Sequence, residues 1–224
     1  MKLTCLLIPA FLCLLSLALR AQANRPPASN ASAWIDIMPG ESFNNWTRVA
    51  IPPDKALDPV SQWSVDKVRG VVICSGDHGH EWLRYDRELA NFILHVEWRF
   101  IKGEGLKGYN SGVFIRNSAN GRVWHQAQVG AGNDGYIFGQ TLLEGKLTEI
   151  KFGPKPKVSY IKPPGEWNTY EIRCQGPKIT LWVNGEMSSE FSAPEVLMGH
   201  LGLEAEGFRI EFRNLKLKLL PGRI

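Results

Sequence analysis

The 224-residue sequence lacks the clustered positive charge that nucleic-acid-binding domains carry. Its formal net charge is +4, but lysine and arginine are scattered, and the longest cationic stretch, 151–162, is interrupted by prolines and a glycine. Disordered and low-complexity chains are also excluded, because 44% of the residues are hydrophobic and only 21% are charged. We therefore expect a globular protein with no nucleic-acid partner.

Several motifs with well-understood chemistry are missing. No Gly-x-Gly-x-x-Gly opens a helix, and there is no Walker motif, no Gly-x-Ser-x-Gly elbow and no His-Glu-x-x-His. The Glu-x-Asp-x-x-Glu alternation that places three carboxylates on one strand face of retaining glucanases is absent too, since Glu81, Asp86 and Glu88 have the wrong spacing. Serine or cysteine nucleophiles and ordinary two-carboxylate glycoside hydrolysis thus have no support.

Only one stretch is apolar over a long distance, and it stands at the N-terminus. A short positive start at Met1-Lys2 is followed by the apolar run 3–19 and by Ala21-Gln22-Ala23, a small-x-small cleavage site. No later stretch reaches the roughly 20 apolar residues that a spanning helix requires. We predict a signal peptide at 1–23, a linker at 24–33 and an exported protein, periplasmic or extracellular, with no membrane span after cleavage. An uncleaved N-terminal anchor is the alternative.

Cysteine is scarce, and cleavage would leave only Cys74 and Cys174 of the four. Outside the cytosol these two can form a disulfide, but the sequence fits two buried thiols equally well. There is no Cys-x-x-Cys and no cysteine–histidine array. The stretch 78–81, His-Gly-His-Glu, could offer two histidines from one strand face, although a solvated loop is the favoured interpretation. We therefore expect neither a metal nor a cofactor.

Strand-like alternation is what the sequence does contain. In 92–100 the even positions are apolar or aromatic, and most of the odd positions are polar. Similar alternation runs through 167–174 and 178–183, and Asn184-Gly185 after the latter is a strong hairpin signal. These segments predict half-buried strands joined by tight turns.

A change of phase follows in 208–219, where the apolar face switches at Asn214. A slip of one residue predicts a β-bulge. Helical periodicity is weak, and the only candidates are single turns at 84–90 and 194–198. Short strands separated by glycine, proline and asparagine turns predict an all-β sandwich or jelly roll, without a second domain after residue 34.

A set of polar residues follows the predicted strand faces. Gln126 and Gln128 share one face by period two, and Arg116 ends another predicted strand. Amide and guanidinium groups suit sugar hydroxyls, because they present directional donors and acceptors. Two other interpretations stay open: a solvated outer face for the glutamines, and an ion pair of Arg116 with Glu97 or Glu211.

Aromatic residues and one histidine lie near this polar set. Trp124 and Trp182 could stack on the apolar faces of pyranoses, although core or edge packing is the commoner role of tryptophan. His125 stands beside Gln126 in the sequence and could act as an acid or base near neutral pH. A buried histidine with satisfied hydrogen bonds, or an exposed one, is the alternative.

Several longer runs resemble one protein family. The runs are 90–99, 110–116, 126–129, 165–172, 183–185, 202–204 and 211–214, with an opening at 34–46 that leads into Asn45-Trp46-Thr47. In this order, and over nearly all of 34–220, they resemble the 3-keto-disaccharide hydrolase domain family. The resemblance implies a concanavalin A-like jelly roll at 34–220.

The same resemblance implies action on disaccharides or glycosides whose sugar carries a ketone at C3. Such a ketone acidifies the C2 hydrogen, so a base can remove it, the glycosidic oxygen on C1 can leave by elimination, and water adds afterwards. The site then needs one base near C2 and donors for the enolate oxygen, rather than two carboxylates. The implied partner is the oxidised sugar, made by a sugar 3-dehydrogenase acting upstream.

The family pattern also suggests roles for individual residues. A glutamate commonly stands where this chain has Gln126, and a neutral amide cannot serve as a base, so we expect His125 or Glu97 to take that role. Substrate contacts are expected for Asn110, Arg116, Gln126, Gln128, Trp182 and Glu204. The alternative function is a lectin-like module that binds carbohydrate without cleaving it.

Overall fold

The computed structural model describes residues 33–132, 134–150, 159–193 and 195–222. The predicted signal peptide and all of the predicted linker except residue 33 lie outside these residues, so export and cleavage stay predictions. In the described residues the regular secondary structure is entirely β-strand. They contain no helix of the length and hydropathy that crossing a membrane demands.

Fifteen strands form in these residues. In chain order they are β1 (Ile35–Asp36), β2 (Trp46–Ala50), β3 (Trp63–Asp66), β4 (Val71–Cys74), β5 (Glu81–Tyr85), β6 (Phe92–Phe100), β7 (Asn110–Asn117), β8 (Trp124–Gly130), β9 (Ile137–Leu143), β10 (Lys146–Ile150), β11 (Asn168–Gln175), β12 (Lys178–Val183), β13 (Glu186–Ser192), β14 (His200–Ala205) and β15 (Ile210–Leu219).

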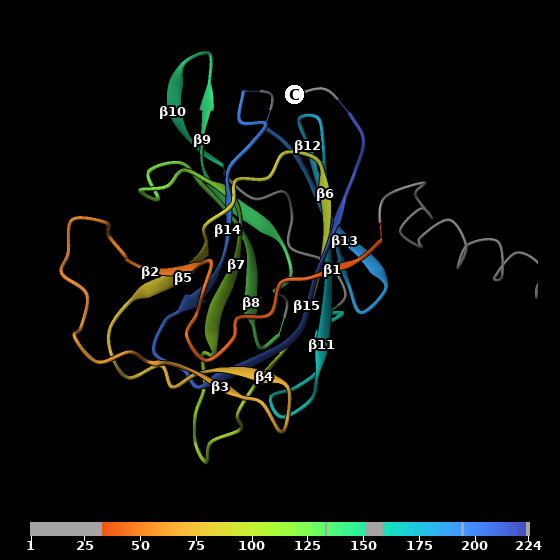
Figure 1. The fold of residues 1–224 in the computed structure, drawn as a ribbon. Coiled ribbons are helices and arrows are strands. Elements are labelled where there is room, and N and C mark those ends of the chain that lie inside the picture. Colours follow the sequence, from red (N-terminus) through yellow and green to blue (C-terminus); the bar gives the residue numbers. More distant parts are fainter. Residues whose placement is uncertain (1–32, 133, 151–158, 194, 223–224) are drawn as a thin grey trace, which may run out of the picture.

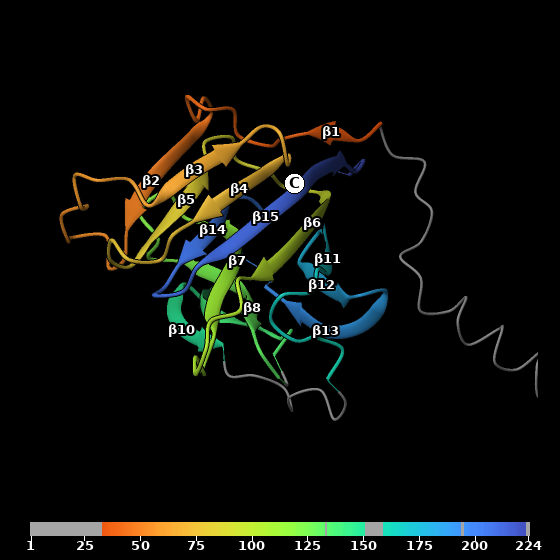
Figure 2. The same cartoon turned by 90° about the horizontal axis from the view of Figure 1, so that it is seen from below.

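The strands build two antiparallel sheets that pack face to face (Figure 1). The eight-stranded sheet has the order β13-β12-β11-β6-β15-β4-β3, with β1 pairing with β15 off this path. The seven-stranded sheet has the order β10-β9-β8-β7-β14-β5-β2. Figure 2 shows β3, β4, β15 and β6 side by side, although they come from distant parts of the chain. The predicted all-β sandwich is confirmed.

The individual strand predictions are confirmed with small shifts at the ends. β6 and β12 begin and end where the alternation predicted, and β11 is displaced by one residue. Asn184 and Gly185 have φ values of 51° and 90° and join β12 to β13, as a two-residue hairpin turn requires. The register between β15 and β6 shifts between Arg213 and Lys216, and Asn214 has a φ of 52°, so the predicted bulge is present.

The two predicted helical turns are wrong for the residues that the structure describes. Arg84 belongs to β5, and Leu89 pairs with Gly199 in an isolated β-bridge. Residues 195–198 are not helical. Leu89 is buried in the core between the sheets, whereas Met198 is 43% exposed, so neither segment presents the apolar stripe that would stabilise a helix by packing.

Cys74 and Cys174 are both buried and free. They lie at opposite ends of the eight-stranded sheet, because Cys74 pairs with Ile210 across the ladder and Cys174 pairs with Phe92. The buried-thiol interpretation is therefore correct. Burial raises the pKa of each thiol to about 12, which makes both poor nucleophiles.

Candidate functional site

Alternation gives the seven-stranded sheet one apolar face and one face of mixed character. In β8, Ala127 and Val129 point into the core between the sheets. Gln126 and Gln128, one residue out of phase, point away from the other sheet. In β7 the same alternation sends Phe114 to the outer face. Gln126, Gln128 and Phe114 therefore lie on the face of this sheet that does not pack against its partner.

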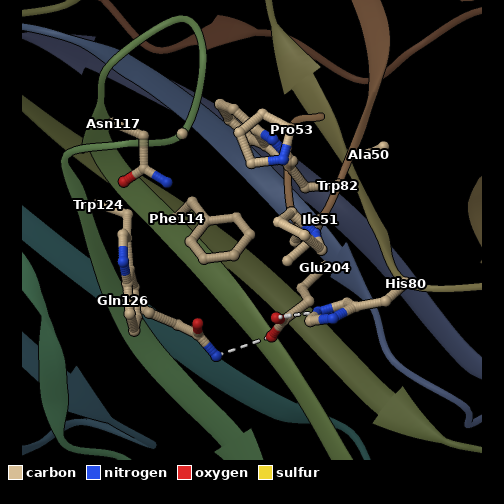
Figure 3. Close-up of a pocket in the computed structure, with 12 residues that line it drawn as sticks. Ala50, Ile51, Pro53, His80, Trp82, Phe114, Asn117, Trp124, Gln126 and Glu204 are labelled. Carbon is tan, nitrogen blue, oxygen red and sulfur yellow. Dashed lines mark hydrogen bonds and ion pairs between the residues drawn. The ribbon is translucent and has the colours of Figure 1, made fainter. Parts of the chain in front are cut away.

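A pocket of about 240 Å³ is hollowed into this outer face. We call it the ring pocket. Its lining consists of Ala50, Ile51, Pro52, Pro53, His80, Trp82, Phe114, Asn117, Gly121, Trp124, Gln126 and Glu204. Trp82 and Phe114 meet edge to face with centroids 5.4 Å apart, and Phe114 and Trp124 do so at 6.5 Å. Figure 3 shows Phe114 and Trp124 on one side of the pocket. Such walls suit the apolar face of a sugar ring.

Polar side chains form a connected row at one end of the ring pocket. Nε2 of His80 lies 2.9 Å from Oε1 of Glu204, and Nε2 of Gln126 donates to Oε2 of the same carboxylate at 2.7 Å. Figure 3 draws both contacts as dashed lines. Behind them Gln126 also donates to Gln128 at 3.3 Å, and Gln128 donates to Asn110 at 2.6 Å. Glu204 is thus held from both sides by side chains of distant segments.

Glycines on the outer face make this row possible. Gln126 on β8 reaches Glu204 on β14 across the strand between them, β7. A Cβ at Gly112 of β7 would lie only 2.2 Å from Nε2 of Gln126. Gly202 plays the same part for Trp82, since a Cβ there would lie 2.2 Å from Cε3 of the indole. Because glycine has no side chain, the side chains of Gln126 and Trp82 can lie directly over these two positions.

Gly112→Ala should therefore lower the free energy of unfolding by about 1–3 kcal/mol, because the added methyl group forces Gln126 out of its place. Urea unfolding measures this change. Gly40→Ala is the matched control, since a Cβ at Gly40 meets nothing within 4 Å, and its effect should stay within about 0.5 kcal/mol. Equal stabilities of the two variants would contradict the crossing of Gln126 over β7.

The environment moves the pKa values of the His80–Glu204 pair. Burial raises the pKa of Glu204 above its ordinary value, and the hydrogen bonds from His80 and Gln126 offset this only in part. Burial alone would lower the pKa of His80, but the hydrogen bond and negative charge of Glu204 outweigh it, so the pKa is raised. The side chain of His80 is 36% exposed and that of Glu204 only 4%. The pair therefore joins a buried carboxylate, whose pKa burial raises, to a half-exposed imidazole, whose pKa the carboxylate raises.

The comparison with protein families agrees with this picture. The model of the 3-keto-α-glucoside-1,2-lyase-like domain matches residues 33–218. The chain belongs to this family. It is thereby a member of a carbohydrate-active group, and the family predicted from the sequence is confirmed. Among curated proteins, none matches the sequence.

Solved structures of related shape share the concanavalin A-like sandwich. A candidate glycosyl hydrolase from Parabacteroides distasonis is 18% identical with a TM-score of 0.57, over 90% of this chain and 97% of that one. The carbohydrate-binding module CBM66 from Bacillus subtilis is 15% identical with a TM-score of 0.56, over 86% and 99%. The β-glucanase of Bacillus licheniformis is 10% identical with a TM-score of 0.52, over 87% and 100%. At these identities the likeness shows the fold alone.

Four of the residues expected to contact substrate are brought together. Gln126, Gln128, Asn110 and Glu204 belong to one hydrogen-bonded row, although only Gln126 and Glu204 line the ring pocket. The two glutamines are 3% and 8% exposed, so the solvated outer face does not apply to them. The resemblance led us to expect a glutamate in place of Gln126; in the structure Glu204 supplies a carboxylate 2.7 Å from the amide nitrogen of Gln126.

His125 lies on the opposite face of the seven-stranded sheet from Gln126. It is fully buried, and burial lowers its pKa to about 4. Nδ1 lies 3.0 Å from the carbonyl oxygen of Ile115, and Nε2 lies 3.0 Å from the hydroxyl of Thr141. Because a carbonyl can only accept, we assign the proton to Nδ1 of a neutral ring. Successive side chains of a strand point to opposite faces, so His125, one residue before Gln126, points into the core.

Glu97 and Trp182 belong to the other sheet. Glu97 accepts hydrogen bonds from Arg213 at 2.8 Å and Asn214 at 2.7 Å. Burial would raise its pKa, but these two contacts lower it below the ordinary value. Trp182 lies on β12 and is 8% exposed. Neither residue lines the ring pocket, so the structure does not place either beside Glu204.

Arg116 is also outside the ring pocket and pairs with neither Glu97 nor Glu211. Its fully buried guanidinium donates to backbone carbonyls: Nε to Ala90 at 3.0 Å, and Nη1 to Gly176 at 2.7 Å and Val196 at 3.4 Å. The expected substrate contact and the expected ion pair are both replaced by a structural role. The sequence around Arg116 could not predict these hydrogen bonds, because the three acceptor carbonyls come from three distant loops.

A group of three side chains near the ring pocket could hold a divalent cation. His80, Glu204 and Glu206 each offer one ligand atom, and these atoms lie within 4.8 Å of one another. Imidazole and carboxylates are donors that zinc and manganese accept. The absence of a metal therefore stays a prediction, and chelation tests it.

The sequence interpretation missed His80 and the aromatic wall formed by Trp82 and Phe114. The signal for His80 is present in the stretch 78–81, where two histidines alternate, but the pattern suggests only a solvated loop or a metal site. In the structure His80 pairs with a carboxylate 124 positions away.

Proposed function

We propose that this chain cleaves 3-keto-glycosides by elimination, with Glu204 as the base and His80 as the acid. The observation that carries the proposal is a buried carboxylate, paired with an imidazole, in the lining of an aromatic pocket. A volume of about 240 Å³ is below the roughly 300–1,000 Å³ of sites for drug-sized ligands, which suits one pyranose ring. Family membership supports the ketone at C3.

The reaction needs only proton transfers. The carboxylate of Glu204 takes the C2 proton, whose acidity the neighbouring ketone raises, and the electrons of the C2–H bond form an enolate. The enolate collapses into a C1=C2 double bond while the C1–O bond breaks with its electron pair on the leaving oxygen. The His80 imidazolium protonates that oxygen, and Glu204 then returns its proton to His80. Water adds to the double bond in a separate step.

The other lining residues support this assignment. No lysine or arginine is among the lining residues of the ring pocket. Of these residues, the His80 imidazolium is therefore the one cationic group that can donate a hydrogen bond to the negative charge that develops on the substrate. Gln126 donates to Glu204 and thereby fixes the carboxylate. Asn117 accepts a hydrogen bond from the backbone N–H of His125 at 2.9 Å, which directs its NH₂ group to the pocket as a donor for a sugar oxygen.

The rate should depend on pH as a bell-shaped curve. Glu204 must be ionised to accept a proton, and because its pKa is raised, kcat/KM should fall on acidification at a midpoint above 4.5. His80 must be protonated to donate, and because its pKa is raised, kcat/KM should fall on alkalinisation at a midpoint above 6.5. The two midpoints belong to the coupled pair. His80→Gln should remove the alkaline limb; a limb that persists would assign it to another group.

Treatment with a chelator distinguishes catalysis by proton transfer from catalysis by a bound metal ion. Treatment with EDTA should leave the cleavage rate of a 3-keto-glucoside unchanged, because no step above uses a cation. Loss of activity that returns with added zinc or manganese would mean that His80 and Glu204 act as ligands, and would overturn their roles as acid and base.

The central experiment is incubation with 3-keto-trehalose and analysis of the released sugars. Glucose should appear, unoxidised trehalose should stay intact, and a substrate deuterated at C2 should be cleaved more slowly, since that bond breaks in the first chemical step. If no sugar is released while titration calorimetry shows saccharide binding, the protein is a binding module and the enzymatic proposal is lost.

The proposal includes a cellular setting. A ketone at C3 requires prior oxidation of the sugar, so a sugar 3-dehydrogenase must act upstream. The apolar run at 3–19 and the cleavage site that follows it support export to the periplasm or beyond.

A further inference from the structure

Gln128 belongs to the polar row but lies outside the ring pocket. Its side chain is buried, and it is not among the residues that line the pocket. It contacts Gln126, which does line the pocket and which donates to Glu204. Gln128 can therefore influence a sugar ring in the pocket only through these neighbours.

The hydrogen bonds of Gln128 determine which end of its amide faces Gln126. Its Nε2 donates to the backbone carbonyls of Ser111 at 3.4 Å and Val129 at 3.3 Å, and to Oδ1 of Asn110 at 2.6 Å. A backbone carbonyl can only accept a hydrogen bond, so the NH₂ group of Gln128 must face these carbonyls. The amide oxygen, Oε1, is then left on the side of Gln126, where it accepts a hydrogen bond at 3.3 Å.

The direction of the Gln126 amide follows from that of Gln128. Because Oε1 of Gln128 faces it, Gln126 must turn its NH₂ group toward this oxygen. The second hydrogen of the same NH₂ group is then directed to Oε2 of Glu204, 2.7 Å from Nε2. With the amide turned over, the carbonyl oxygen of Gln126 would face the carboxylate, acceptor against acceptor, and would repel the group that His80 holds from the other side.

The backbone of Gln128 is fixed independently of any ligand. Its carbonyl oxygen accepts a hydrogen bond from the buried hydroxyl of Tyr170, which comes from β11 of the other sheet. Its N–H donates to the carbonyl of Tyr136 at 2.9 Å. Gly112 stands opposite Gln128 on β7 and leaves the space that the Gln126 side chain crosses. The core, rather than the substrate, therefore sets the point from which the row is oriented.

We propose that Gln128 is a positioning residue, which acts through Gln126 to hold Glu204 where its carboxylate can take the C2 proton. The inference rests on the proposed function, because it takes Glu204 as the base. It replaces the substrate contact that the sequence predicted for Gln128, and it gives the two glutamines of one strand face different roles. Gln126 bonds to the carboxylate, whereas Gln128 fixes the direction of that bond.

Two substitutions of Gln128 separate this role from a purely structural one. Gln128→Met keeps the length of the side chain but offers Gln126 no acceptor, so kcat for 3-keto-trehalose should fall about tenfold or more as the hydrogen bond to the charged carboxylate weakens. Gln128→Glu again presents an oxygen to Gln126, so it should restore most of the lost kcat. Both variants remove the NH₂ group that faces Ser111 and Val129, so urea unfolding should show both to be destabilised. Equal losses of kcat in the two variants would mean that stability alone is at stake, and would overturn the inference.

The Michaelis constant distinguishes positioning from substrate contact. KM should be the same for Gln128→Met and the wild type, because Gln128 lies outside the ring pocket. Gln140→Met is the matched control, since Gln140 lies on β9 of the same sheet but is not part of the polar row, and its replacement should change neither kcat nor KM. A raised KM with an unchanged kcat would make Gln128 a substrate-binding residue and refute the positioning role.

An NMR measurement keeps the inference separate from the fate of the enzymatic proposal. In the wild type both hydrogens of the Gln126 side-chain NH₂ group are bonded, one to Gln128 and one to Glu204, so they should exchange slowly with water. Exchange should be about tenfold faster or more in Gln128→Met, and slow again in Gln128→Glu. If the wild type cleaves no keto sugar, the proposed function fails, but this comparison still decides whether Gln128 orients Gln126. Equal exchange in the wild type and Gln128→Met would refute it.

Discussion

Glu204→Gln should lower kcat for 3-keto-trehalose by about 10²–10⁴-fold, the usual contribution of a positioned acid or base. The amide keeps the shape of the side chain but cannot accept the C2 proton. Stability should not fall, because Glu204 is 3% exposed and the variant removes a carboxylate whose charged form burial disfavours. Steady-state kinetics and thermal unfolding of the same preparations measure the two effects.

Glu97→Gln is the discriminating comparison for this result. Glu97 is the carboxylate that the sequence pattern suggested as a base, and it pairs with Arg213 and Asn214 on the other sheet. Its replacement should leave kcat unchanged. If Glu97→Gln abolished turnover while Glu204→Gln remained active, the site would have to be sought on the eight-stranded sheet.

Arg116→Met should lower the free energy of unfolding by about 3–5 kcal/mol, because three backbone carbonyls lose the charged donor that they share. The methionine fills part of the volume but leaves the carbonyls of Ala90, Gly176 and Val196 without their donor. Each buried acceptor without a partner costs about 1–3 kcal/mol. Urea unfolding at constant pH measures the change.

Activity data complete this prediction. At a temperature where both proteins are folded, KM for the keto sugar should be the same for Arg116→Met and wild type, because Arg116 lies outside the ring pocket. Arg173→Met is the control for stability: Arg173 bonds to Gln175 beside it and should change unfolding by no more than about 0.5 kcal/mol. A normal stability with a strongly raised KM would restore Arg116 as a substrate-binding residue.

The local features of the fold could be predicted because their causes are local. Alternation in β6 and β12 follows from burial of one strand face, and the turn at Asn184-Gly185 follows from the φ values that these two residues tolerate. The change of phase at Asn214 in the sequence corresponds to the bulge between β15 and β6 in the structure. Alternation also placed Gln126 and Gln128 on one face, and the same reasoning applied to His125 would have excluded it from that face.

The candidate site could not be assembled in the same way. Gln126 and Glu204 are 78 positions apart and meet only because β14 inserts beside β7 at one register. His80 reaches the same carboxylate from the start of β5, on the other side of β14. No local pattern encodes which strands become neighbours.

By itself, then, the amino-acid order determined the family, the all-β class, the boundaries of a few strongly alternating strands and the presence of amides on one sheet face, since each depends on near neighbours or on residue type. Tertiary structure decided which carboxylate those amides hold, that His80 joins it, and that Arg116 and His125 are buried outside the ring pocket. The physical reason is that inter-strand register is selected by burial of the whole core, which no single segment specifies.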